Sequence, residues 1–142
     1  MAELKWKSAQ AEFETFWTGK SQYCYGFEDT RAAMGAAGTR RVFTKARPSD
    51  YLVTDNGMTF FAEVKSSQHP TSFNLHNIET EQWKTAIRVT TAFGIYLFFI
   101  RRESDLQWYR VPGAYMIHTW KQGRRIVRWT ELEQFKRELN GH

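Results

Sequence analysis

The sequence predicts an α/β domain in which helices flank a central mixed β-sheet. Apolar residues recur at helical spacing near the N-terminus and again after residue 79. A hairpin signal at Asn56-Gly57 and an apolar run from Gly94 to Ile100 indicate strands. The 142 residues have the length of one domain, and no repeat or Pro/Ser-rich linker divides them. We therefore expect residues 1–142 to form a single domain.

The first two expected elements are a helix and a strand. From Glu3 to Trp17, apolar residues are spaced by three and four positions, and Gly19 is a suitable helix stop. Aromatic residues are frequent from Gln22 to Phe27, which predicts a strand.

A basic segment, residues 29–47, follows this strand. Gly35, Gly38 and four alanines favour a flexible chain there. Five basic residues and no acidic ones lie between positions 30 and 49: Arg31, Arg40, Arg41, Lys45 and Arg47. We expect an arm that binds the DNA phosphate backbone, with a solvated surface loop as the alternative.

The hairpin signal also predicts a strand register. Asn56-Gly57 suits a two-residue type I′ turn, which needs positive φ at both central residues. Residues paired across that turn have numbers that sum to the same value, so Asp50 is opposite Glu63. Because side chains two residues apart share a face of a strand, Lys65 lies on the same face as Glu63.

The second half of the chain supplies the remaining elements. A stripe containing Trp83 and Ala86 predicts an amphipathic helix, and the apolar run after it predicts a strand covered on both faces. A first-turn proline and a Thr130/Glu133 capping-box pattern mark two further helices. The expected elements are a helix at 79–93, strands at 94–100 and 107–111, a short helix at 112–120, an edge strand at 126–129 and a helix at 130–139.

Composition excludes several classes of protein. The chain is 42% hydrophobic and 16% aromatic, which is unlike a disordered sequence. Cys24 is the single cysteine, so an internal disulfide and a four-cysteine zinc site are excluded. The apolar run is too short to cross a bilayer, and the N-terminus lacks a secretory signal pattern, so we expect a cytoplasmic protein without a membrane partner. The net charge of +5 favours an anionic partner.

The hairpin brings together groups that suit a divalent cation. Two carboxylates directly opposite on a sheet repel each other, and a cation between Asp50 and Glu63 would remove that conflict. Mg²⁺ prefers oxygen ligands, and the backbone carbonyl of Val64 offers another. Lys65 beside the metal would position a water or neutralise charge on a phosphate. The alternative is an exposed hairpin whose charges are solvated or paired in a salt bridge.

The spacing Asp50, twelve residues, then Glu63-Val64-Lys65 resembles the core motif of PD-(D/E)XK nucleases, the restriction-endonuclease-like fold. Other motifs resemble RecU-type Holliday-junction resolvases and their phage-borne relatives. These motifs are Phe13-Glu14, Tyr25-Gly26-Phe27-Glu28-Asp29, Ser49-Asp50-Tyr51, the segment 72–78, Gln82 and the strand 94–99. The resemblance covers residues 13–120, and the compact chain suits a phage origin.

This resemblance implies a metal-dependent endonuclease that acts as a homodimer on four-way DNA junctions, using Mg²⁺ or, in its place, Mn²⁺. By position, Asp50 and Glu63 match the metal-binding carboxylates, and Lys65 matches the catalytic lysine. Glu14 matches an acid on the first helix that completes the metal shell or holds its waters. Gln82 matches a glutamine that orients the attacking water or a phosphate. The basic segment 29–47 matches the stalk that enters the junction.

The chain also departs from the family pattern. Pro48 stands one residue before the usual proline position and leaves Ser49 before the aspartate, a variation that also occurs in the RecU branch. Gln10-Ala11-Glu12 replaces a usual Gly-Lys start of the helix motif. Glu12 is therefore an alternative to Glu14. Two other functions stay open at this point: a nuclease of the same fold that acts on another DNA substrate in repair or restriction, and a non-catalytic DNA-binding module. Because 142 residues leave no room for a fused recognition domain, we expect a resolvase rather than a restriction enzyme.

Overall fold

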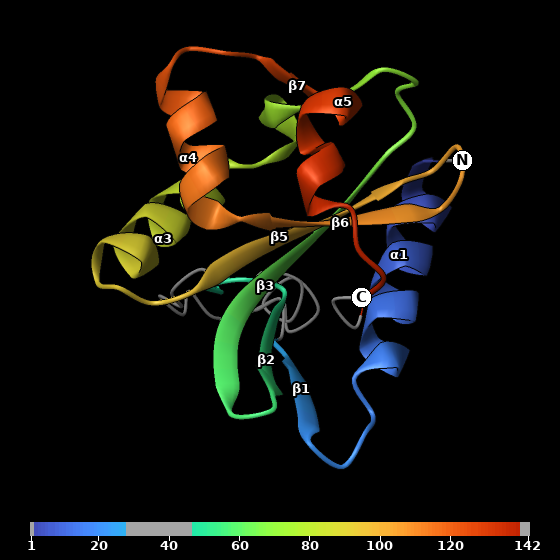
Figure 1. Ribbon diagram of the computed structural model, residues 1–142, viewed down its shortest axis with the longest axis vertical. Helices are drawn as coiled ribbons and strands as arrows, with labels where there is room; N and C mark the ends of the chain where they lie inside the picture. Colours follow the sequence, from blue (N-terminus) through green and yellow to red (C-terminus); the bar gives the residue numbers. More distant parts are fainter. Residues whose placement is uncertain (1, 28–46, 140–142) are drawn as a thin grey trace, which may run out of the picture.

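The computed structural model describes residues 2–27 and 47–139. A five-stranded sheet runs through the middle of the molecule, with α1 on one face and α3, α4 and α5 on the other (Figure 1). This arrangement confirms the predicted α/β class with a mixed sheet flanked by helices.

The strand order in the sheet is β1-β2-β3-β5-β6. Antiparallel pairing joins β1 (Gln22–Gly26) to β2 (Tyr51–Asp55), and β2 to β3 (Met58–Ser67). The central pair, β3 with β5 (Tyr96–Arg102), is parallel, and β6 (Gln107–Pro112) pairs with β5 in the antiparallel sense. The parallel pair is possible because a crossover containing α3 returns the chain to the same end of the sheet.

The β2–β3 hairpin has the register that the sequence predicts. Asn56 and Gly57 form the turn with φ values of 50° and 84°, the two positive angles that a type I′ turn requires. Asp55 pairs with Met58 and Tyr51 with Ala62. One step further along this register, Asp50 lies beside Glu63.

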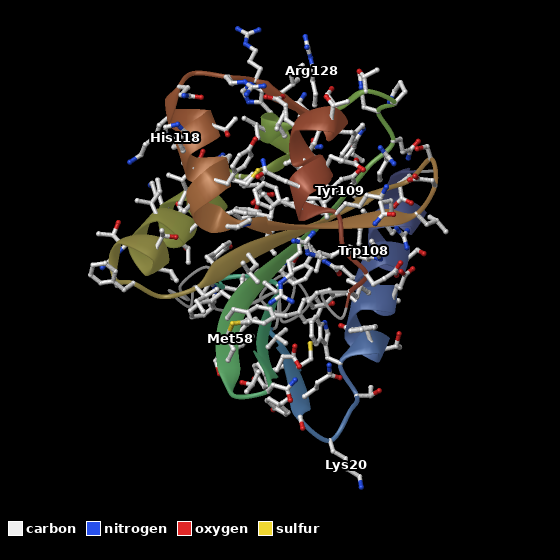
Figure 2. All side chains as sticks on the ribbon, viewed as in Figure 1. Lys20, Met58, Trp108, Tyr109, His118 and Arg128 are labelled. Carbon is white, nitrogen blue, oxygen red and sulfur yellow. The ribbon has the colours of Figure 1, made fainter. Side chains whose placement is uncertain are left out.

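Two apolar cores lie on opposite faces of the sheet. The helix α1 (Ala2–Phe16) packs through Phe13, whose ring centroid is 4.9 Å from that of Phe99 on β5. On the other face, α3 (Thr80–Thr91) and α4 (Gly113–Lys121) cover Phe98 and its neighbours. Adjacent residues of β6 show the alternation directly: Trp108 points toward the α1 side and Tyr109 toward the α5 side (Figure 2).

A second, two-stranded sheet corrects one expectation from the sequence. The strand β7 (Ile126–Arg128) pairs with β4 (Ser72–Asn74), not with the edge of the main sheet. We did not predict β4 because three residues are too short to show a strand period. The 3-10 helix η1 (Leu75–Asn77) follows β4 and leads the chain toward α3.

Several helix ends also differ from expectation. The last helix, α5 (Trp129–Leu132), has Arg128 as its N-cap and Glu131 in the capping box, rather than Thr130 and Glu133. It continues only into the 3-10 helix η2 (Glu133–Phe135) instead of extending to residue 139. The expected first-turn proline, Pro112, is the N-cap of α4.

None of the helices in the described part of the chain is long and apolar enough to span a membrane.

Candidate active site

Three elements bring the predicted catalytic residues into one pocket. Asp50 comes directly before β2, Glu63 and Lys65 lie in β3, and Gln82 lies in the first turn of α3. All four line a cavity of about 350 Å³, together with Val64. The structure therefore assembles the core of the candidate site as the hairpin register predicts.

Asp50 is held from two sides. Its carboxylate is only 4% exposed, and Oδ2 accepts a hydrogen bond of 2.8 Å from the backbone N–H of Val64. Oδ1 forms an ion pair of 2.9 Å with the Arg47 guanidinium. The contact with Val64 fixes the carboxylate against β3 at the point where the β2–β3 ladder ends.

Glu63 is the most buried acid of the site, with an exposed fraction of 1%. Its Oε1 accepts a hydrogen bond of 2.9 Å from Gln82 Nε2, and its Oε2 accepts one of 3.1 Å from the Tyr96 hydroxyl. Burial, followed by the charge of Asp50, raises the pKa of Glu63 well above its usual value, and the nearby Lys65 only partly offsets this. A buried acid whose pKa is raised by burial and by a neighbouring carboxylate lies in a site that favours added positive charge.

Gln82 orients Glu63. Its Oε1 accepts a hydrogen bond of 2.8 Å from the backbone N–H of Glu79, as part of the capping box that starts α3. Because this bond fixes the side-chain amide, Nε2 is directed at Glu63. The sequence placed Gln82 in the site and assigned it to a water or phosphate, whereas its amide contacts a carboxylate.

The pocket includes residues that the sequence reasoning did not assign to the site. Gln10 reaches it from α1, and Ser66 follows Lys65 on β3. Asn77 ends η1, and Glu79 is the N-cap of α3. Asn77 belongs to the segment 72–78 that resembles the RecU pattern, so that motif was an available signal. Gln10 lies one helical turn before Glu14, in the Gln10-Ala11-Glu12 stretch that replaces the usual Gly-Lys start of the helix motif, and that departure was the available signal.

The structure does not bring Glu14 or its alternative, Glu12, into the pocket lining. Glu14 Oε1 accepts a hydrogen bond of 2.8 Å from the hydroxyl of Tyr51, whose side chain lies in the core on the α1 face of the sheet. Glu12 forms an ion pair of 2.9 Å with the buried Arg101. In the described residues, no group of three His, Cys, Asp or Glu side chains is placed to hold a metal ion.

Most of the predicted DNA-binding arm lies outside the described residues. This applies to Arg31, Arg40, Arg41 and Lys45. Arg47, the last basic residue of the arm, is described and lies in the pocket beside Asp50.

The arrangement can support hydrolysis of a phosphodiester. Two adjacent carboxylates offer hard oxygen ligands to a divalent cation. Lys65 is half-buried on the pocket wall, and its cationic group suits a phosphate. A hairpin that presents two carboxylates and a lysine on a mixed α/β sheet is the arrangement of the PD-(D/E)XK fold.

Comparison with protein families makes the assignment more specific. The family model described as "Recombination protein U" matches residues 29–142. The chain belongs to this RecU family of Holliday-junction resolvases. The match includes Asp50, Glu63, Lys65 and Gln82 and begins after α1 and β1.

Known structures support the fold. A 1.6 Å structure of Hjc from Archaeoglobus fulgidus, a Holliday junction resolvase from an archaeal hyperthermophile, has a TM-score of 0.57 with 9% sequence identity. The similarity covers 94% of this chain and 94% of that one, so it extends over nearly the whole fold. No curated protein sequence matches the chain.

Proposed function

We propose that the protein is a divalent-metal-dependent endonuclease that resolves four-way DNA junctions by paired phosphodiester hydrolysis. The observation that carries this proposal is the neighbouring pair of buried carboxylates, Asp50 and Glu63, in a pocket shared with Lys65.

The donor set fits a hard cation. Asp50 and Glu63 supply carboxylate oxygens, and their mutual repulsion is relieved by bound positive charge. Val64 donates its N–H to Asp50, and the N–H and C=O of one strand residue point to the same side of the strand. The Val64 carbonyl therefore faces the Asp50 side and suits the third protein ligand. Mg²⁺ keeps several waters and uses few carboxylates, so this small set suits it, with Mn²⁺ as a substitute.

Each side chain then has a part in the reaction. A bound cation would polarise the scissile phosphate and lower the pKa of a coordinated water. Lys65 neutralises charge that develops on the phosphate, while the water attacks phosphorus and the bond to the leaving oxygen breaks. Gln82 and Tyr96 fix the two oxygens of Glu63, so the carboxylate does not need to reorganise during the reaction. Glu14 acts indirectly: it accepts a hydrogen bond from the hydroxyl of Tyr51, the residue that follows Asp50.

The proposed assembly is a homodimer of single domains. Two symmetric cuts across a junction require two active sites related by a two-fold axis. The basic segment 29–47, with Arg31, Arg40, Arg41 and Lys45, binds the junction backbone. This segment lies between β1 and Asp50 in the sequence, and its last residue, Arg47, forms an ion pair with Asp50. The proposed DNA-binding arm therefore ends at the site.

The test compares cleavage of an immobile four-way junction with cleavage of a linear duplex of the same sequence, in Mg²⁺ and in EDTA. Junction cutting that is lost in EDTA and in Asp50→Asn supports the proposal. Asp50→Asn should still bind the junction, because the basic arm is unchanged. Equal cutting of both substrates would instead indicate a nuclease with another DNA substrate, and junction binding without cutting under any metal would indicate a binding module.

A further inference from the structure

Arg47 occupies the one oxygen of Asp50 that the backbone does not hold. Its Nη2 lies 2.9 Å from Oδ1, while Oδ2 is bound by the N–H of Val64. The two sides differ in what can move. The Val64 N–H is part of β3, whereas the Arg47 side chain is one-third exposed and reaches in from the pocket wall.

The position of Arg47 conflicts with that of a cation on the same oxygen. A divalent ion bound to Oδ1 would lie within a few ångströms of the guanidinium, and two positive charges at that distance repel each other, more so beside a carboxylate that is only 4% exposed. The guanidinium must therefore leave Oδ1 when a cation is bound there. Its five N–H donors suit a phosphate, which is the anion that DNA brings to this pocket.

We propose that Arg47 is an exchangeable counter-ion: it neutralises Asp50 in the metal-free protein and transfers to a DNA phosphate when a divalent cation binds. This inference rests on the proposed function, because it takes Asp50 to be a metal ligand. It adds that DNA and metal bind cooperatively, since a phosphate that holds Arg47 frees Oδ1 for the cation. The same coupling requires that metal strengthens the binding of DNA.

The proposed exchange predicts a change in metal affinity that can be measured without DNA. Calorimetry with Ca²⁺ as the probe, on the full chain, should show tighter binding for Arg47→Gln than for the unmodified protein. The expected gain is about 1.5-fold to fivefold, the range for loss of one partly exposed competing ion pair. Arg47→Lys keeps the positive charge and should remain close to the unmodified protein. Arg125→Gln, an exposed arginine outside the pocket lining, is the matched control for the loss of one charge.

Adding an immobile junction completes the experiment. DNA should raise the Ca²⁺ affinity of the unmodified protein, and this gain should be smaller in Arg47→Gln. Thermal unfolding of each variant checks that the fold is retained.

Two results would overturn the inference in different ways. If Asp50→Asn loses Ca²⁺ binding but Arg47→Gln binds no tighter than the unmodified protein, Asp50 is a metal ligand and Arg47 is not its competitor. If Asp50→Asn leaves Ca²⁺ binding unchanged, the metal site itself is elsewhere, and the inference fails together with the proposed function.

Discussion

Glu63→Gln should stabilise the metal-free protein at neutral and alkaline pH while abolishing cleavage. Glu63 is 1% exposed, and burial and the charge of Asp50 raise its pKa well above the usual value. Between the pKa of the unfolded chain and that of the folded protein, the folded state keeps a proton that the unfolded state has lost. Folding stability therefore falls as pH rises through this window.

The size of the effect follows from the pKa of Glu63. Each unit by which folding raises it removes about 1.4 kcal/mol of stability once the pH exceeds the folded value. Glutamine has nearly the same volume and carries no charge, so the variant does not lose this free energy. The gain should be largest at high pH in EDTA, and Mg²⁺ should restore stability only to the unmodified protein.

Urea unfolding in EDTA between pH 5 and 8.5 measures this difference. The free energies of unfolding of the two proteins should diverge as pH rises, with Glu63→Gln the more stable at the alkaline end. Glu81→Gln removes an exposed acid from α3 and should follow the unmodified protein. Parallel curves for Glu63→Gln and the unmodified protein would refute the reasoning, because Glu63 would then ionise as freely in the folded as in the unfolded chain.

Three further variants test other parts of the account. Lys65→Met should lower the single-turnover cleavage rate by about 100-fold to 1,000-fold, while junction affinity measured by fluorescence anisotropy in Ca²⁺ changes by less than about threefold; an equal loss of both would make Lys65 a general DNA contact. Replacing Arg40 and Arg41 with glutamine should reduce the slope of log affinity against log salt by about one unit for each lost phosphate contact, and an unchanged slope would exclude the arm from the interface. Gly113→Ala should cost about 1–3 kcal/mol in urea unfolding, because the new Cβ would lie 2.6 Å from the backbone oxygen of Tyr96; unchanged stability would mean that β5 shifts freely there.

The sequence was sufficient to predict that Asp50, Glu63 and Lys65 come together, because one local signal determines their positions. Asn56-Gly57 requires a two-residue turn, and that turn fixes the register through to Tyr51 and Ala62. Period-two alternation then directs Glu63 and Lys65 to one face. No long-range information is needed for this step.

The contacts of the other site residues depend on tertiary structure. Arg47 was expected to bind DNA as part of the arm, and its ion pair with Asp50 depends on the path of the backbone through Pro48 and Ser49. Gln82 contacts Glu63 because the capping box of α3 fixes its amide. Glu14 was expected at the metal, and the packing of α1 on the opposite face of the sheet directs it to Tyr51.

The elements that the sequence misplaced are short. A three-residue strand such as β4 has no measurable period, so the expected edge strand at 126–129 had no predicted partner outside the main sheet. Near α5, Thr130/Glu133 and Arg128/Glu131 both offer a residue pair at capping-box spacing. The pairing of β7 with β4 determines which pair caps the helix, since it places Arg128 at the end of the strand and directly before α5.

Cleavage of a supercoiled plasmid that extrudes a cruciform tests the central claim most directly. Two coordinated nicks across the junction yield linear plasmid, whereas a single nick relaxes the DNA, reabsorbs the cruciform and leaves an open circle. The account predicts linear product in Mg²⁺, none in EDTA and none with Asp50→Asn. Open circles alone, or linear product from Asp50→Asn, would contradict it.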